Sequence, residues 1–196
     1  ESLFVERGGA GAVPLPLVAR VVAGGHTSRY GVRHVGSYGR VGRTRDDAAG
    51  EAYDKVAKLL GLGYPGGPAV DTLAREGDET AVELPVTRMK HRDRNAPSMT
   101  GELDFSFSGL KTAVMRHVNA SHITSRKEVA DVCASFQRVV VSTLLDRLFD
   151  AAKQFGAQSV GIAGGVSANS RLRDDLTKRG MRGGLPVFIP RLSLST

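Results

Sequence analysis

Apolar residues recur at three- and four-residue intervals between residues 46 and 60, a pattern that predicts an amphipathic helix. The apolar stripe comprises Ala48, Ala49, Ala52, Val56, Leu59 and Leu60, and the opposite face carries Asp47, Glu51, Asp54 and Lys58. Asp46 or Asp47 is expected to cap the helix start, where unpaired amides and the helix dipole favour a carboxylate. Gly61 and Gly63 are expected to end the helix, because glycine readily adopts the left-handed conformation of a helix C-cap.

The rest of the chain alternates between short apolar runs and longer helical patterns. Apolar, mostly β-branched runs predict strands at residues 17–23, 28–35, 35–43, 159–163 and 186–190. Helical spacing predicts helices at residues 69–75, from Ser106 or Ser108 as cap onward, over 127–154 as one long helix or two shorter ones, and at 170–179. We therefore expect an α/β fold.

Three glycine-rich turns interrupt this pattern and are candidate ligand-binding sites. They are Gly24-Gly25 between the first two strands, Gly66-Gly67-Pro68 after the first helix, and Gly164-Gly165 before the last helix. Glycine lets the backbone approach a ligand closely, and a helix N-terminus presents amides and a dipole to an anion. Each turn also has a plain structural interpretation: a hairpin, a solvated helix face with Glu51–Lys55 and Asp54–Lys58 pairs, and a helix cap by Asn169.

The composition says more about the class of binding partner than about the fold. The 196 residues include 27 Lys and Arg against 20 Asp and Glu, a net charge of +7 that favours a polyanionic partner, nucleic acid above all. The basic run that holds Arg88, Lys90, Arg92 and Arg94 is either a solvated loop or a contact to phosphates.

The remaining composition excludes some sites and locations. The single cysteine, Cys133, cannot form an internal disulfide, and its apolar helical setting predicts a buried thiol. The five histidines show no ligand spacing, so no metal site is predicted within these residues. No apolar tract is long enough for a membrane span and no secretory signal is visible, so a cytoplasmic location is expected.

Four long motifs, in order, resemble one protein family. They are VVAGGHT at 21–27, DDAAGEAYDKVAKLLGLGYPGGP at 46–68, DFSFSGLKTAV at 104–114 and GIAGGVSANSRLR at 161–173. Together they resemble the TsaD/Gcp (Kae-type) family of tRNA adenosine threonylcarbamoyltransferases. The resemblance implies an actin-like ATPase lobe of the Hsp70 and sugar-kinase superfamily. Residues 1–15 would be a linker or frayed end, residues 16–62 with 156–196 the core, and residues 63–155 a mainly helical insertion.

The resemblance also implies a reaction and its binding residues. The family transfers a threonylcarbamoyl group from threonylcarbamoyl-AMP to N6 of adenosine 37 in tRNAs that read ANN codons. The adenylate phosphate would lie against Val21, Val22, Ala23, Gly24 and Gly25. The ribose would meet Asp54 and Gly67, with Asp71 nearby, and the adenine side would meet Asn169. The family commonly has serine where this chain has Ala23, so one hydroxyl is lost and the glycine amides remain.

The resemblance further implies a divalent metal, iron or zinc, and partner subunits of a tRNA threonylcarbamoylation complex. The family's metal ligands would lie outside this chain, which we expect to be a fragment of a longer protein with doubtful activity by itself. The alternatives are a non-catalytic nucleotide-binding or scaffold subunit of the same fold, an inactive truncated fragment, and an actin-like small-molecule kinase.

Overall fold

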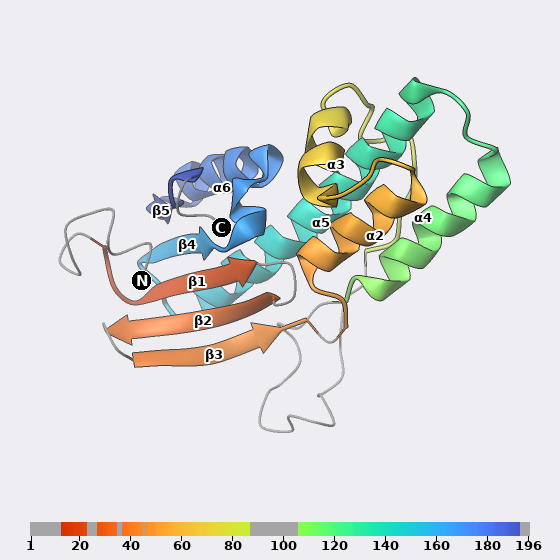
Figure 1. Cartoon of the computed structure of the whole chain (residues 1–196). Coiled ribbons are helices and arrows are strands. Elements are labelled where there is room, and N and C mark those ends of the chain that lie inside the picture. Colours follow the sequence, from red (N-terminus) through yellow and green to blue (C-terminus); the bar gives the residue numbers. More distant parts are fainter. Residues whose placement is uncertain (1–12, 23–26, 35–36, 45, 87–105, 193–196) are drawn as a thin grey trace.

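The protein is an α/β structure in which one sheet lies beside a group of helices (Figure 1). This computed structural model describes residues 13–22, 27–34, 37–44, 46–86 and 106–192. The sheet has five strands: β1 Leu17–Val22, β2 Thr27–His34, β3 Ser37–Arg43, β4 Ser159–Ala163 and β5 Val187–Phe188. The helices are α2 Ala49–Leu59, α3 Gly66–Ala74, α4 Ser108–Ser121, α5 Arg126–Gln154 and α6 Ser170–Gly183, with the short 3-10 helix η2 Gly165–Ala168.

The strands are ordered β3-β2-β1-β4-β5 across the sheet. β2 runs antiparallel to both of its neighbours, whereas β4 runs parallel to β1 and to β5. The first three strands are a meander of sequential hairpins, and the chain then passes through four helices before it returns to the sheet at β4. The predicted strands are therefore confirmed, each to within one or two residues at its ends.

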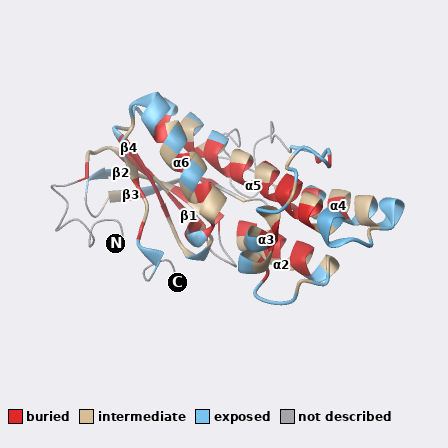
Figure 2. Ribbon diagram, turned by 90° about the horizontal axis from the view of Figure 1, so that it is seen from above, coloured by how far each residue is buried: buried red, intermediate tan, exposed pale blue. Residues whose placement is uncertain are grey.

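The long pattern at 127–154 is a single helix, α5, that spans about 43 Å at the usual rise per residue. Its start has a capping box, in which Ser125 accepts from the Glu128 amide and Glu128 accepts in return from the Ser125 amide. One part of α5 packs on β1 and β4, and another packs on α3 and α4. Figure 2 shows this helix running from the sheet to the helical group, with buried residues along its length. It therefore connects the two parts of the molecule.

The strands pack their two faces against different neighbours. Val18 and Val22 of β1 and Val160 and Ile162 of β4 join the main core with α5 and α6. Because successive strand residues point to opposite faces, Leu17 lies on the other face, where it packs with Val32, Phe188 and the preceding residue Val13. The main core continues through α2, α3 and α4, so the sheet and the helical group share one apolar interior.

Two expected helix caps are wrong. The N-cap of α2 is Ala48, and the hydroxyl of Thr27, from the start of β2, accepts the hydrogen bond of the Ala49 amide at 2.9 Å. Asp47 instead pairs with Lys55, which also contacts Glu51 as predicted. Tertiary packing therefore supplies the cap from a distant strand, although a local carboxylate was available.

Asp46 anchors the start of α4 instead of capping α2. Its carboxylate accepts hydrogen bonds from the Ser106 hydroxyl and from the Phe107 amide, the latter at 2.8 Å. The N-cap of α4 is Phe107 without a side-chain cap, so neither Ser106 nor Ser108 has the expected role. The carboxylate of Asp46 satisfies the helix start in their place.

The single cysteine of the chain lies in the interior. Cys133 on α5 is fully buried, as predicted, and burial raises the pKa of its thiol to about 12.

Across residues 13–86 and 106–192, apart from the short undescribed gaps, no helix combines the length and apolar character needed to cross a bilayer. The predicted division into domains stays a prediction; all five strands come from the two segments assigned to the core, and α2 packs on α3 and α4.

Candidate functional site

Two predicted motifs meet at one edge of the sheet. β1 and β4 are parallel, so the end of β1 at Val21 and Val22 and the turn that follows β4 lie at the same edge, which is where ligands bind in open α/β sheets. Gly164 follows β4 with φ of +88°, and a Cβ there would lie 2.7 Å from the Val22 carbonyl oxygen. The β4 turn therefore touches the end of β1, next to the predicted residues Val21 and Val22. The other predicted residues of that loop, Ala23, Gly24 and Gly25, lie outside the described residues.

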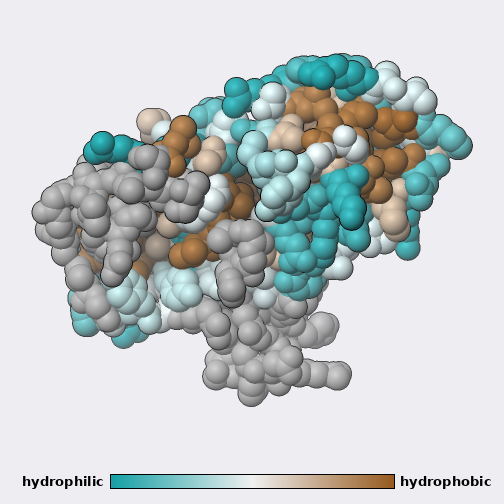
Figure 3. Space-filling view, in the orientation of Figure 1, coloured by the Kyte–Doolittle hydropathy of each residue, from teal (hydrophilic) through white to brown (hydrophobic). Residues whose placement is uncertain are grey.

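A cleft of about 510 Å³ opens between this edge and the helices α2 and α3. Four predicted residues from three parts of the fold line it: Asp54 on α2, Gly67 and Asp71 on α3, and Asn169 before α6. The remaining lining residues are Gly50, Tyr53, Pro68, Thr72, Gly165, Val166, Ala168 and Leu192. Figure 3 shows apolar atoms in the recess between the α6 side and the α2–α3 side of the surface. A mostly apolar recess with a few convergent polar groups is typical of a small-molecule site.

The first wall of the cleft depends on a close approach of α3 to α2. A Cβ on Gly66 would lie 2.7 Å from the Ala57 Cβ and 2.7 Å from the Asp54 Cα, so only glycine fits there. The Gly66 amide donates to the Asp54 carboxylate at 2.8 Å. The turn expected at Gly66-Gly67-Pro68 is thus the first turn of α3, and Asp54 binds this helix start instead of forming the expected surface pair with Lys58.

The second wall is held by Asp71, whose carboxylate binds the start of α6. One oxygen, Oδ2, accepts from the Ser170 amide at 3.1 Å, and the other, Oδ1, accepts from the Ser170 hydroxyl at 2.9 Å. Arg75 lies 3.6 Å from Oδ2, one helical turn away on α3. A carboxylate at a helix N-terminus meets unpaired amides and the positive end of the dipole. Asp71 therefore joins α3 to α6 across the cleft.

Asn169 caps α6 and also faces the cleft, so both interpretations of this residue hold geometrically. Its Oδ1 accepts from the Leu172 amide at 2.9 Å, as an N-cap does. Its Nδ2 donates to Gln137 Oε1 at 2.8 Å and to Asp71 Oδ1 at 3.2 Å, with a longer contact of 3.4 Å to the Tyr53 hydroxyl. These bonds fix which end of the amide carries the oxygen.

The sequence analysis missed three residues that complete this network: Tyr53, Gln137 and Ser170. Gln137 lies on the core stripe of α5 and Tyr53 on that of α2, and both are almost fully buried. Burial, and next the negative charge of Asp71, raise the pKa of Tyr53 well above its ordinary value, so the phenol stays protonated. The ring of Tyr53 meets Phe136 edge-on at 5.2 Å. A polar residue on an otherwise apolar helical face was the signal that could have identified both.

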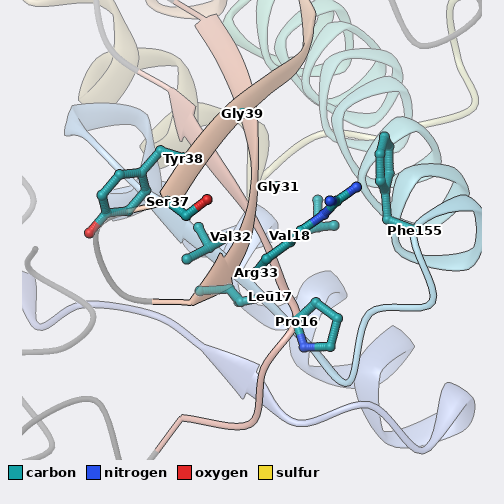
Figure 4. A pocket seen from close by; sticks show the side chains of 10 residues that line it. All are labelled: Pro16, Leu17, Val18, Gly31, Val32, Arg33, Ser37, Tyr38, Gly39 and Phe155. Atoms are coloured by element: carbon teal, nitrogen blue, oxygen red, sulfur yellow. The ribbon is translucent and has the colours of Figure 1, made fainter.

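A second pocket, of about 540 Å³, lies at the other end of β1, β2 and β3. Arg33, Tyr38 and Phe155 are its largest side chains, and Figure 4 shows the two aromatic rings at opposite ends of the labelled group. The polar groups therefore do not converge, and no predicted site residue lines this pocket. The cleft beside Asn169 is the better candidate.

Two further predictions concern other parts of the chain. The basic residues Arg88, Lys90, Arg92 and Arg94 lie outside the described residues. Within the described part of the chain, no three His, Cys, Asp or Glu side chains are grouped closely enough to hold a metal ion.

Comparison with known proteins identifies the family. A family model described as TsaD, tRNA N6-adenosine threonylcarbamoyltransferase, matches residues 3–196. A relative of that name from Koribacter versatilis is 44% identical, with 96% of this chain and 58% of the relative covered. One from Anaeromyxobacter dehalogenans is 48% identical, with 92% of this chain and 52% of the relative covered. The chain thus spans about half the length of these curated relatives.

Solved structures show the fold alone. Full-length HypF in a phosphate- and nucleotide-bound form superposes with a TM-score of 0.68 at 12% identity. The match covers 95% of this chain and 38% of the HypF chain. HypF from T. kodakarensis superposes with a TM-score of 0.52 at 18% identity. This match covers 78% of this chain and 17% of the HypF chain. Both are consistent with the α/β fold. The match over almost the whole sequence, together with relatives of 44–48% identity, shows that this chain belongs to the tRNA N6-adenosine threonylcarbamoyltransferase family.

Proposed function

We propose that the cleft binds threonylcarbamoyl-AMP, and that the whole protein transfers its threonylcarbamoyl group to N6 of adenosine 37 in tRNAs that read ANN codons. One observation carries the proposal: Asp54, Gly67, Asp71 and Asn169, which come from α2, α3 and the start of α6, line one recess. The names of the relatives support tRNA as the acceptor.

Each part of the adenylate has a suitable neighbour in this proposal. The ribose hydroxyls meet Asp54 at the start of α3, where Gly67 leaves the backbone open because nothing lies within 4 Å of a Cβ built there. Asn169 Oδ1 has a second lone pair beyond the one that accepts from Leu172, and this lone pair suits the adenine amino group. The phosphate contacts proposed from the family resemblance are Val21, Val22, Ala23, Gly24 and Gly25, because glycine amides can face phosphate oxygens without steric hindrance.

We also propose the finer fold assignment, an actin-like ATPase lobe. The antiparallel pairing of β1 with β2 and the parallel pairing of β1 with β4 support it. The family's divalent metal does not fit the described residues, which offer no group of three His, Cys, Asp or Glu side chains to hold it. The proposed partner subunits and cytoplasmic location rest on the family resemblance.

Calorimetric titration with a stable threonylcarbamoyl-adenylate analogue tests the site. Asp54→Ala and Asn169→Ala should each weaken binding by about 1–3 kcal/mol, the cost of losing a hydrogen bond to a bound polar group. Asp174→Ala, at an exposed position on α6, is the matched control and should bind as the parent does. Unchanged affinity in both cleft variants would show that the adenylate binds elsewhere.

Binding of tRNA is tested separately at the basic run. Arg88, Lys90, Arg92 and Arg94 are replaced together by alanine, and tRNA affinity is measured over a salt series. Each lost phosphate contact should reduce the slope of log affinity against log salt by roughly one. An unchanged slope rules the run out as a tRNA contact.

A further inference from the structure

We propose that Gln137 is a positioning residue of the adenylate cleft, which links the carboxylate of Asp71 to the amide of Asn169 and orients that amide without touching the ligand. The inference rests on the proposed adenylate site. Gln137 lies behind the cleft and is absent from its lining, and it contacts three lining residues, Tyr53, Asp71 and Asn169.

The two shorter hydrogen bonds of Gln137 are complementary and have one polarity, and a longer one of 3.4 Å comes from the Tyr53 hydroxyl. Its Oε1 accepts from Asn169 Nδ2 at 2.8 Å, and its Nε2 donates to Asp71 Oδ1 at 3.1 Å. A flipped amide would set nitrogen against nitrogen and oxygen against oxygen, since a carboxylate only accepts. The charge of Asp71 therefore sets the orientation of Gln137, and Gln137 in turn sets that of Asn169.

This orientation decides what Asn169 offers to a ligand. With Nδ2 held by Gln137 and Asp71, Oδ1 is the amide atom that remains able to accept from the cleft. Without Gln137, the Asn169 amide loses its shortest Nδ2 bond and keeps only its bonds to Asp71 and to the Leu172 amide. Oδ1 would then be held less firmly toward the adenine.

Burial makes the role of Gln137 stringent. The residue is 3% exposed on α5, where water cannot replace a missing partner. Ionisable groups surround it on the packed elements: Tyr53 on α2, Asp71 and Arg75 on α3, and Glu79 after α3. From α6, Arg171, Asp174, Asp175 and Lys178 line a pocket that Gln137 also lines. Asp71 is the one negative charge that is bonded directly to Gln137.

The first test is Gln137→Met, which keeps the volume and removes both hydrogen bonds. Titration with the adenylate analogue should show about a tenfold to hundredfold loss of affinity. In a cycle with Asn169→Ala, the double variant should bind no more weakly than Asn169→Ala alone, because the effect passes through Asn169. Additive losses would mean that Gln137 acts only through packing.

The second test is Gln137→Glu, which makes the same contacts only while its carboxyl is protonated. A neutral carboxyl accepts from Asn169 and donates to Asp71, whereas the ionised form repels Asp71. Burial and this neighbour raise the pKa of the introduced carboxyl, so the affinity ratio to the parent should approach one near pH 5 and fall at least about tenfold by pH 9. Gln154→Glu, at an exposed position on the same helix, should keep a constant ratio.

The outcomes separate the two proposals. A parent chain that does not bind the analogue overturns the adenylate site itself. A parent that binds, with a Gln137→Glu ratio that does not change with pH, overturns the positioning role. Thermal unfolding of every variant at each pH restricts the comparison to folded protein, and the cycle with Gln137→Met decides the matter if Gln137→Glu does not fold.

Discussion

Helix α5 carries two polar clusters that differ in burial. At its exposed start, Arg126 pairs with Glu76 at 2.7 Å and Lys127 pairs with Asp131 one turn along. Three turns further on, Gln137 joins Asp71 and Asn169 in the interior behind the cleft. The first cluster consists of charged pairs near the surface. The second has one buried charge, the Asp71 carboxylate, which is bonded to neutral amides and hydroxyls and has the exposed Arg75 at 3.6 Å.

The difference in burial shows which side-chain contacts require a fixed geometry. Exposed ion pairs gain little, because solvent screens the charges and ordering two long side chains costs entropy. In the buried cluster each donor has a specific acceptor, and removing one member leaves another unpaired out of reach of water. Substitutions around Gln137, behind the cleft, should therefore lower stability or affinity strongly, and substitutions at the exposed start of α5 should have little effect.

The largest effect is expected at Gly66, which sets the approach of α3 to α2. Gly66→Ala places a Cβ 2.7–2.8 Å from Ala57, Asp54 and the Tyr53 carbonyl, and should destabilise the fold by about 3 kcal/mol. Gly67→Ala is the matched control, since nothing lies within 4 Å of its Cβ. Urea unfolding measures both, and equal midpoints would show that α2 and α3 are not locked together.

Asp71→Asn should follow, with a loss of about 2 kcal/mol. An amide has one acceptor oxygen, so its NH2 group must oppose either the Ser170 amide or the donors at Oδ1. Asp174→Asn, at an exposed position on α6, should leave the urea midpoint unchanged. A full-stability Asp71→Asn variant would mean that the network tolerates an unpaired donor.

Tyr53→Phe should cost less, about 0.5–1 kcal/mol. The hydroxyl is buried, but both of its hydrogen bonds are long, at 3.4 Å to Gln137 and 3.4 Å to Asn169. The ring keeps its edge-on contact with Phe136. Thermal unfolding checks the stability, and a loss as large as that of Asp71→Asn would place the hydroxyl at the centre of the network.

The smallest effect is expected at the exposed end, for Glu76→Gln. The hydrogen bond from Arg126 lowers the pKa of Glu76, so the stabilisation is present above its ordinary pKa near 4.5 and disappears as pH falls through the lowered value. Urea midpoints of parent and variant should differ slightly at pH 7 and coincide in acid. A difference that persists in acid would point to packing by Glu76 instead of charge.

Local patterns predicted the elements well because their apolar spacing agrees with the packing found. The stripe from Ala48 to Val56 is buried, and β4 spans the predicted residues 159–163. The caps failed because Thr27, more than twenty residues away, supplies the hydrogen bond that a local aspartate was expected to make. A long-range partner of this kind leaves no periodic signal.

The site was predicted in part for a related reason. Asp54, Gly67, Asp71 and Asn169 are in or close to motifs that the resemblance marked, and the structure gathers them. Gln137 was hidden, because it follows Phe136 within a long apolar helix and no spacing relates it to Asn169, thirty-two residues later. Its contribution depends on how α5 crosses behind α3 and α6, which only the tertiary arrangement shows.

The position of Cys133 makes its thiol a probe of local opening around α5. The thiol lies one helical turn before Gln137, is fully buried, and has its pKa raised to about 12. Thiol reagents attack the thiolate, so the folded protein protects this atom by both burial and protonation. As it is the single cysteine of the sequence, its modification rate reports how often α5 separates from its neighbours, without any introduced label.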